Sequence, residues 1–150
     1  MVKRTRHSLT MVYVHLVWTT KHRVAVLSEQ LSGKLCTLAK EAGKNQGVEV
    51  IVCGGYEDHM HVFVRYRPDQ KISDIARKLK ASLSYWLRRE GQLPDFEWQE
   101  GYGAFSVSHN DTHRIINYIR KQKEHHQEGS TNELLEPANA GPDGPESAGV

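Results

Sequence analysis

The stretch Gly55-Tyr56-Glu57-Asp58-His59-Met60-His61-Val62-Phe63-Val64 decides how this chain folds. Its alternating β-formers are typical of a strand that begins near His59. Side chains two apart on a strand point to the same face, so we expect His59 and His61 to lie together and the apolar residues between and after them to pack on the other face. Two neutral imidazoles on a rigid strand are suited to binding a divalent metal, whereas on a solvated face they would be polar residues and nothing more.

A second segment, residues 110–126, is predicted to be a helix of about four turns. Asp111 is placed to cap its N-terminus, isoleucines recur at helical spacing, and the segment contains no Pro or Gly. Residues four apart on a helix lie one above another, so Arg114, Tyr118 and Gln122 form one stripe. This stripe would combine a cation for phosphate, a hydroxyl nucleophile and an amide oxygen for a metal, although most helix tyrosines only bury the ring and hydrogen-bond the hydroxyl.

The remaining sequence predicts alternating strands and helices. We expect a strand over 10–20, followed by a helix that Ser28 caps and that ends between Gly43 and Gly47. The later elements, in order, are a strand over 48–53, a turn at Gly54-Gly55, the histidine strand over 59–66, a helix opening at Pro68-Asp69, and a strand over 104–108. This order is the split βαβ pattern and predicts an α+β, ferredoxin-like (βαββαβ) antiparallel sheet with an added C-terminal helix. The first two helices would cover one face of the sheet and leave the other for function.

Composition indicates one compact domain. The 150 residues are 38% hydrophobic and 25% charged, which is ordinary for a globular protein. Apolar stretches fall far short of the ~20 residues that cross a bilayer, and the N-terminus lacks the apolar core of a signal peptide. We therefore expect a cytoplasmic protein without membrane contact, with a domain over residues 1–127 and an acidic, flexible tail over 128–150.

The two cysteines, Cys36 and Cys53, lack the C-x-x-C spacing of a redox or metal motif. We expect free buried thiols, which are the usual state in a reducing compartment. A less favoured alternative places Cys53 beside His59 and His61 in a zinc site.

Charge is unevenly distributed along the chain. The net charge is +2, but residues 128–150 contain five acidic residues and no Lys or Arg, so the preceding part is more basic than the whole. Basic surfaces with exposed aromatic rings suit a nucleic-acid partner, because cations neutralise phosphates and rings stack on unpaired bases. A solvated helix face explains part of the same pattern. The candidate DNA-binding residues are Lys21, Arg23, Arg65, Lys78, Lys80, Arg114 and Lys121.

Taken in order, the motifs of residues 10–126 resemble the small single-tyrosine transposases of the HUH class, the IS200/IS605 insertion-sequence group. The shared motifs are VHLVWTTKHR at 14–23, GG at 54–55, DHMH at 58–61, KLK at 78–80, WQEGYGAFSVS at 98–108, and YIRKQ at 118–122 followed by His125-His126. The chain departs from the family pattern at two places. His22 stands where the family usually has tyrosine, and the tail replaces the apolar helical sequence that usually follows the paired histidines.

The resemblance implies a chemistry for these residues. Tyr118 would attack a phosphodiester in single-stranded DNA, form a 5′-phosphotyrosine link and free a 3′-hydroxyl. His59, His61 and Gln122 would hold Mg²⁺ or Mn²⁺; imidazoles by themselves favour Mn²⁺, Co²⁺ or Zn²⁺, and it is the resemblance that favours Mg²⁺. The expected partner is single-stranded DNA with hairpin ends, and no nucleotide cofactor is needed because the covalent link conserves the phosphodiester energy.

The resemblance also implies a homodimer in which the Tyr118 helix of one subunit reaches the histidine strand of the other. The uncovered sheet face gives a separate reason for association, since we expect it to expose apolar side chains. These are Trp18, Phe63, Phe105 and Ile119, and we prefer a subunit contact for Phe63 over base stacking.

Two other functions stay open on the sequence. One is an HUH enzyme domesticated to process repeated chromosomal palindromes, with the same chemistry. The other is a non-catalytic ferredoxin-like module that binds nucleic acid, although the third strand lacks the aromatic pattern of an RNA-binding sheet.

Overall fold

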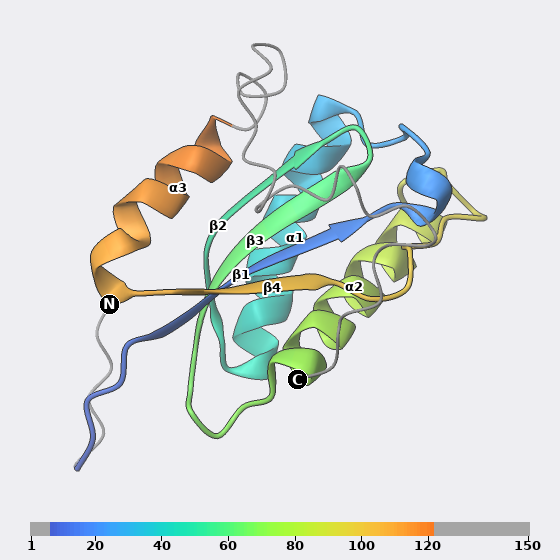
Figure 1. Cartoon of the computed structure of the whole chain (residues 1–150). Helices are drawn as coiled ribbons and strands as arrows, with labels where there is room; N and C mark the ends of the chain where they lie inside the picture. Colours follow the sequence, from blue (N-terminus) through green and yellow to red (C-terminus); the bar gives the residue numbers. More distant parts are fainter. Residues whose placement is uncertain (1–6, 122–150) are drawn as a thin grey trace, which may run out of the picture.

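A computed structural model describes residues 7–121, which form a four-stranded antiparallel sheet with helices against both faces (Figure 1). The elements are β1 (Val12–Thr19), η1 (Lys21–Arg23), α1 (Glu29–Gln46), β2 (Glu49–Tyr56), β3 (His59–Tyr66), α2 (Ile72–Arg89), β4 (Gly103–Val107), η2 (His109–Asp111) and α3 (Thr112–Arg120). The strand order is β2-β3-β1-β4. This βαββαβ order with an added helix confirms the predicted α+β, ferredoxin-like fold.

Helices α1 and α2 cover one face of the sheet and enclose the main core. Met60, Val62 and Val64 of β3 are buried there, as their strand parity predicts. The Ser28 hydroxyl accepts a hydrogen bond of 3.1 Å from the Leu31 N–H, and this confirms the predicted cap of α1. The helix ends at Gln46, and Gly47 caps it with a φ of 73°, the left-handed conformation that glycine adopts without steric cost.

Helix α3 packs on the other face of the sheet (Figure 1). Its buried residues Ile115 and Ile119 form a second apolar cluster with Tyr13 of β1, Val52 of β2 and Phe63 of β3. This cluster holds α3 across the strands that carry the histidines.

The packing of α3 overturns the expectation of an exposed apolar sheet face. Phe63 of β3 is 0% exposed and Ile119 of α3 is 1% exposed, because this helix and this strand pack together within one chain. Trp18 is 2% exposed and belongs to the core under α1 and α2, while Phe105 is half-buried. The apolar-surface argument for association and the preferred subunit contact of Phe63 are therefore wrong.

The turn between β2 and β3 lies later than predicted. β2 continues through Gly54 and Gly55 to Tyr56, and the chain reverses at Glu57 and Asp58, where Glu57 has a φ of 44°. The two glycines do not form the turn; they permit other elements to approach the backbone of β2 closely. A Cβ on Gly54 would lie 2.9 Å from the Ile119 carbonyl oxygen of α3.

We expect Gly54→Ala to lower the free energy of unfolding by about 1–3 kcal/mol, because the added methyl must push α3 away from β2. Gly33→Ala is the matched control, since nothing lies within 4 Å of its added Cβ and alanine favours the interior of α1. Chemical denaturation of both variants measures the difference. Equal stability of the Gly54 variant and the wild type would contradict the close packing of α3.

Other element ends differ by a few residues from the prediction. α2 begins at Ile72 because Pro68 and Asp69 lie in a turn, in which the Gln70 side-chain oxygen accepts a 2.8 Å hydrogen bond from the Arg67 N–H. β1 and β4 shift at their ends by one or two residues, as strand ends commonly do.

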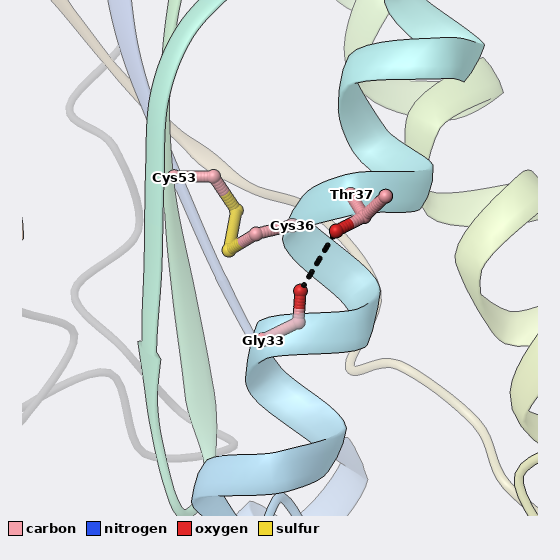
Figure 2. Close-up of a disulfide and its surroundings, with 4 residues drawn as sticks. All are labelled: Gly33, Cys36, Thr37 and Cys53. Carbon is pink, nitrogen blue, oxygen red and sulfur yellow. Dashed lines mark hydrogen bonds between the residues drawn. A yellow bond between two sulfur atoms is a disulfide. The ribbon is translucent and has the colours of Figure 1, made fainter.

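Cys36 of α1 and Cys53 of β2 form a disulfide (Figure 2), so the expectation of free thiols is wrong. Their Cα atoms are 5.3 Å apart, a spacing that a disulfide spans. Cys53 pairs with Val62 in the sheet register and therefore faces the helices, away from the face of His61. The alternative zinc site with Cys53 as a ligand is wrong for the same reason.

Several predicted features lie outside the described residues: Gln122, His125, His126 and the acidic tail over 128–150. Within residues 7–121, no helix combines the length and apolarity that a membrane crossing needs.

Candidate active site

Three buried histidines gather on the sheet face that α3 overlies. His59 and His61 come from β3 and His15 from β1, with exposed fractions of 1%, 0% and 0%. The ring centroids of His59 and His61 are 5.1 Å apart, which confirms that the two side chains share a face. Val17 is opposite His61 in the β1–β3 register, so His15 is a diagonal neighbour of His61.

His61 is hydrogen-bonded to His15. The Nε2 atom of His15 and the Nδ1 atom of His61 are 2.8 Å apart, and the two rings stack with centroids 5.0 Å apart at an interplanar angle of 26°. The Phe105 ring lies 6.0 Å from that of His15 on its β4 side. Packing and hydrogen bonding together fix the orientation of both imidazoles.

His59 is hydrogen-bonded to a carboxylate. Its Nδ1 atom is 2.8 Å from Oδ1 of Asp58, and the Arg23 Nε–H donates to Oδ2 of the same carboxylate at 3.1 Å. Burial alone would raise the pKa of Asp58, but the hydrogen bonds from His59 and Arg23 outweigh it and hold that pKa below its usual range. Asp58 is therefore ionised at neutral pH, and its carboxylate accepts a hydrogen bond from the Nδ1–H of His59.

The turn after β1 brings Arg23 to this carboxylate. His22 and Arg23 both have left-handed backbone conformations, with φ of 58° and 55°. The Thr20 hydroxyl donates to the Val24 carbonyl at 2.8 Å and closes the turn. Such conformations are uncommon for residues other than glycine and need surrounding contacts to hold them.

The histidine pair fits a divalent metal in its donor chemistry. Nδ1 of each ring is engaged, by Asp58 in His59 and by His15 in His61, so Nε2 is the nitrogen that each ring can offer to a metal. Within residues 7–121, no group of three or more His, Cys, Asp or Glu side chains is arranged to hold an ion. The remaining predicted ligand, Gln122, follows directly after the last described residue.

α3 places Tyr118 beside the histidines. The ring centroids of Tyr118 and His61 are 6.0 Å apart and the rings meet edge to face at 83°, while Ile115 and Ile119 anchor the helix on either side. Asp111 occupies the predicted N-cap position, but its carboxylate accepts from the Ser108 hydroxyl at 3.0 Å instead of from a helix N–H. Tyr118 thus lies against His61 of its own chain, whereas the shared-site expectation requires a partner's histidines.

Four of the candidate DNA-binding residues lie on the elements around this site. Arg23 is held by Asp58, and Lys21 forms a 2.8 Å ion pair with Glu97. Arg114 and Lys121 are exposed on and just after α3.

The other three candidate DNA-binding residues lie away from the histidines. Arg65 is 8% exposed at the far end of β3, where it donates to the Thr10 carbonyl at 3.1 Å. Lys78 and Lys80 are on α2, which packs on the opposite face of the sheet. The Lys80 ammonium group donates to the carbonyls of Gln99 and Gly101 at 2.8 and 2.7 Å. The seven predicted cations therefore do not form one surface.

Comparison with known proteins agrees with this fold. Residues 8–122 match the transposase family described as IS200-like. The chain belongs to this family. Its members are DNA-processing enzymes, and the match confirms the resemblance that the sequence motifs indicated.

Individual transposases show the same relationship. The ISDra2 transposase TnpA of Deinococcus radiodurans is 27% identical over 127 residues, which are 81% of this chain and 91% of the relative. A crystal structure described as a transposase from the same species aligns with a TM-score of 0.63 at 22% identity, over 80% of this chain and 97% of that one. A REP-associated tyrosine transposase bound to a REP hairpin aligns with a TM-score of 0.59 at 16% identity, over 84% and 74% of the two chains. At these identities the two structures show a common fold.

Sequence reasoning missed two residues of this candidate site. Asp58 was seen only as part of the motif before His59, although a carboxylate next to a candidate metal ligand is a common partner for its second ring nitrogen. His15 was seen only as one residue of a strand, although a histidine flanked by apolar residues on both sides must find a buried polar partner.

Proposed function

We propose that this transposase cleaves and rejoins single-stranded DNA at the ends of an insertion sequence, with Tyr118 as the nucleophile. The observation that supports it best is the position of Tyr118, whose ring lies 6.0 Å from that of His61 on a helix within the family match. A tyrosine beside two fixed imidazoles on an accessible helix is suited to a covalent phosphoryl-transfer step.

The first step is an in-line displacement. The Tyr118 hydroxyl gives up its proton to water, its oxygen bonds to the phosphorus of the scissile phosphodiester, and the bond to the 3′-oxygen breaks. The leaving strand takes up a proton from water and ends in a 3′-hydroxyl. The product is a 5′-phosphotyrosine link. In the second step a 3′-hydroxyl attacks such a link, releases Tyr118 and rejoins the strands without external energy.

A tyrosine hydroxyl ordinarily has a pKa near ~10, so this step needs a polarised phosphate. His59 and His61 would hold Mg²⁺ or Mn²⁺ through Nε2, with the amide oxygen of Gln122 as a further ligand. When bound, such an ion withdraws charge from the phosphate and orients it for attack. Asp58 and Arg23 keep the His59 ring in place.

The proposed substrate is single-stranded DNA with hairpin ends, since a flexible strand can bend into the site while a hairpin contacts basic side chains. Arg114 and Lys121 flank Tyr118 on the exposed side of α3, and they are the cations best placed to hold the strand. Arg23, which is bound to Asp58 beside His59, and Lys21, which follows β1 and pairs with Glu97, are the further proposed contacts to the same DNA strand.

Covalent capture tests the proposed function. Labelled single-stranded oligonucleotides that span the DNA on each side of the gene are incubated with the protein and Mn²⁺, and the same sequences as duplexes serve as the control. We expect a denaturation-resistant adduct with the single strands alone. Hairpin binding without an adduct would indicate a non-catalytic module. Capture of repeated chromosomal palindromes instead of the flanks would indicate a domesticated enzyme with the same chemistry.

We further propose that each site is built within one chain, although the resemblance still leads us to propose a homodimer. A mixture of Tyr118→Phe and His61→Ala, each inactive alone, should then stay inactive after subunit exchange, because each chain lacks one half of its own site. Native mass spectrometry verifies that heterodimers form. Recovered cleavage would mean that the two subunits exchange α3, so that the helix of each subunit packs on the sheet of its partner through the same contacts.

A further inference from the structure

We propose that His15 is a positioning residue for the metal site: its hydrogen bond holds His61 in the tautomer and orientation that present Nε2 to the ion. The inference deepens the proposed function and rests on it. His15 does for His61 what the Asp58 carboxylate does for His59. Each ligand on β3 thus has its own fixed partner.

The proton arrangement follows from metal binding through Nε2 of His61. A neutral imidazole has one N–H and one lone-pair nitrogen, and a ring that binds a metal through Nε2 carries its proton on Nδ1. His61 Nδ1 is 2.8 Å from His15 Nε2, a distance that suits a hydrogen bond in either direction. A His61 ring that binds the ion through Nε2 therefore donates its Nδ1–H to His15, and neutral His15 carries its own proton on Nδ1. The reverse arrangement would place the His61 proton on Nε2 and block metal binding.

The surroundings of His15 make this bond rigid. The side chain is 0% exposed, stacks on the ring of His61 at 5.0 Å and lies beside Phe105, so water does not compete for the hydrogen bond. Partners that orient a metal-binding histidine commonly contribute about 10- to 100-fold to metal affinity.

The neighbouring Tyr13 provides a matched control. It is on the same strand and the same face, is 8% exposed, and its hydroxyl makes a 3.0 Å hydrogen bond to Nδ1 of His109. Tyr13→Phe removes a partly buried hydrogen bond to an imidazole but touches neither His59 nor His61. Its effect on metal binding measures what a general loosening of the face would do.

Two substitutions of His15 distinguish the loss of its hydrogen bond to His61 from the loss of its packing. In His15→Gln the side-chain amide reaches about as far as the imidazole Nε2 and can still accept the proton of His61 Nδ1. In His15→Asn the amide stops near the place of Nδ1 and cannot reach His61. Both replacements are polar and smaller than the ring, so they leave similar packing defects, which thermal melts of each variant will record.

The test is a calorimetric titration of the DNA-free full chain with Mn²⁺. We expect His15→Asn to bind Mn²⁺ about 10- to 100-fold more weakly than the wild type, while His15→Gln and Tyr13→Phe keep most of the affinity. Equal affinity in His15→Asn and the wild type would overturn the proposal. Absence of Mn²⁺ binding in the wild type would instead overturn the proposed metal site, and this inference with it.

Nuclear magnetic resonance of the ring nitrogens gives a second readout that needs neither metal nor activity. We expect the wild type to carry the His61 proton on Nδ1 and His15→Asn to lose this preference, with Tyr13→Phe unchanged. A wild-type His61 protonated on Nε2 would refute the positioning role even if His15→Asn weakened Mn²⁺ binding.

Discussion

Tyr118→Phe is expected to abolish cleavage and adduct formation, with a rate loss of at least about 10³-fold, because the variant has no oxygen to attack the phosphorus. The ring and its contact with His61 remain, so stability and hairpin affinity should change little. Gel assays of labelled single-stranded ends with Mn²⁺ measure the cleavage rate and the adduct, and a binding assay without metal measures the affinity.

Tyr85→Phe is the matched control for this prediction. Tyr85 is 58% exposed on α2, where Arg89 lies over its ring at 4.9 Å, and α2 packs on the face of the sheet opposite Tyr118. Loss of this hydroxyl should leave the cleavage rate unchanged. An undiminished adduct in Tyr118→Phe would remove Tyr118 from the mechanism.

His61→Ala is expected to have the second-largest effect, a loss of cleavage with hairpin binding retained. The substitution removes one proposed metal ligand and the edge-to-face contact with Tyr118, whereas the proposed phosphate contacts come from Lys and Arg side chains elsewhere. Parallel measurements of cleavage rate and hairpin affinity separate the two effects.

His113→Ala is the control for the histidine prediction, since His113 is exposed on α3 and should not affect either quantity. The buried His61 ring also supports His15, so a thermal melt must show that the variant is folded. Equal losses of cleavage and binding in a folded His61→Ala would indicate a structural histidine.

The alternation of side chains along the histidine strand was the feature that the sequence predicted most reliably. The period of two along 59–66 correctly separated His59 and His61 from Met60, Val62 and Val64, because a slip by one residue would have turned the histidines toward α1 and α2. The helix cap at Ser28 could be predicted as well, since the capping interaction involves residues only three apart in the chain.

Contacts between elements that are distant in the chain could not be predicted from the sequence. The disulfide depends on the parity of Cys53 in β2, and the end of this strand was predicted too early because Gly54 and Gly55 were read as a turn. Gly54 instead permits the close approach of α3, and Gly55 that of Ser32 on α1. The burial of Phe63 depends on where α3 lies, and no local pattern encodes that position. His15 and His61 are 46 residues apart, so their bond appears only once β1 and β3 are paired.

The central claim is that Tyr118 forms the covalent bond to DNA, and mapping the adduct tests it most directly. The wild type is reacted with labelled single-stranded ends and Mn²⁺, the DNA is digested to a short remnant, and the protein is cleaved with trypsin. Cleavage after Arg114 and Arg120 releases residues 115–120, in which Tyr118 is the only tyrosine. The account predicts that mass spectrometry finds the nucleotide remnant on this peptide. A remnant on a peptide that carries Tyr13, Tyr56 or Tyr102 would contradict it.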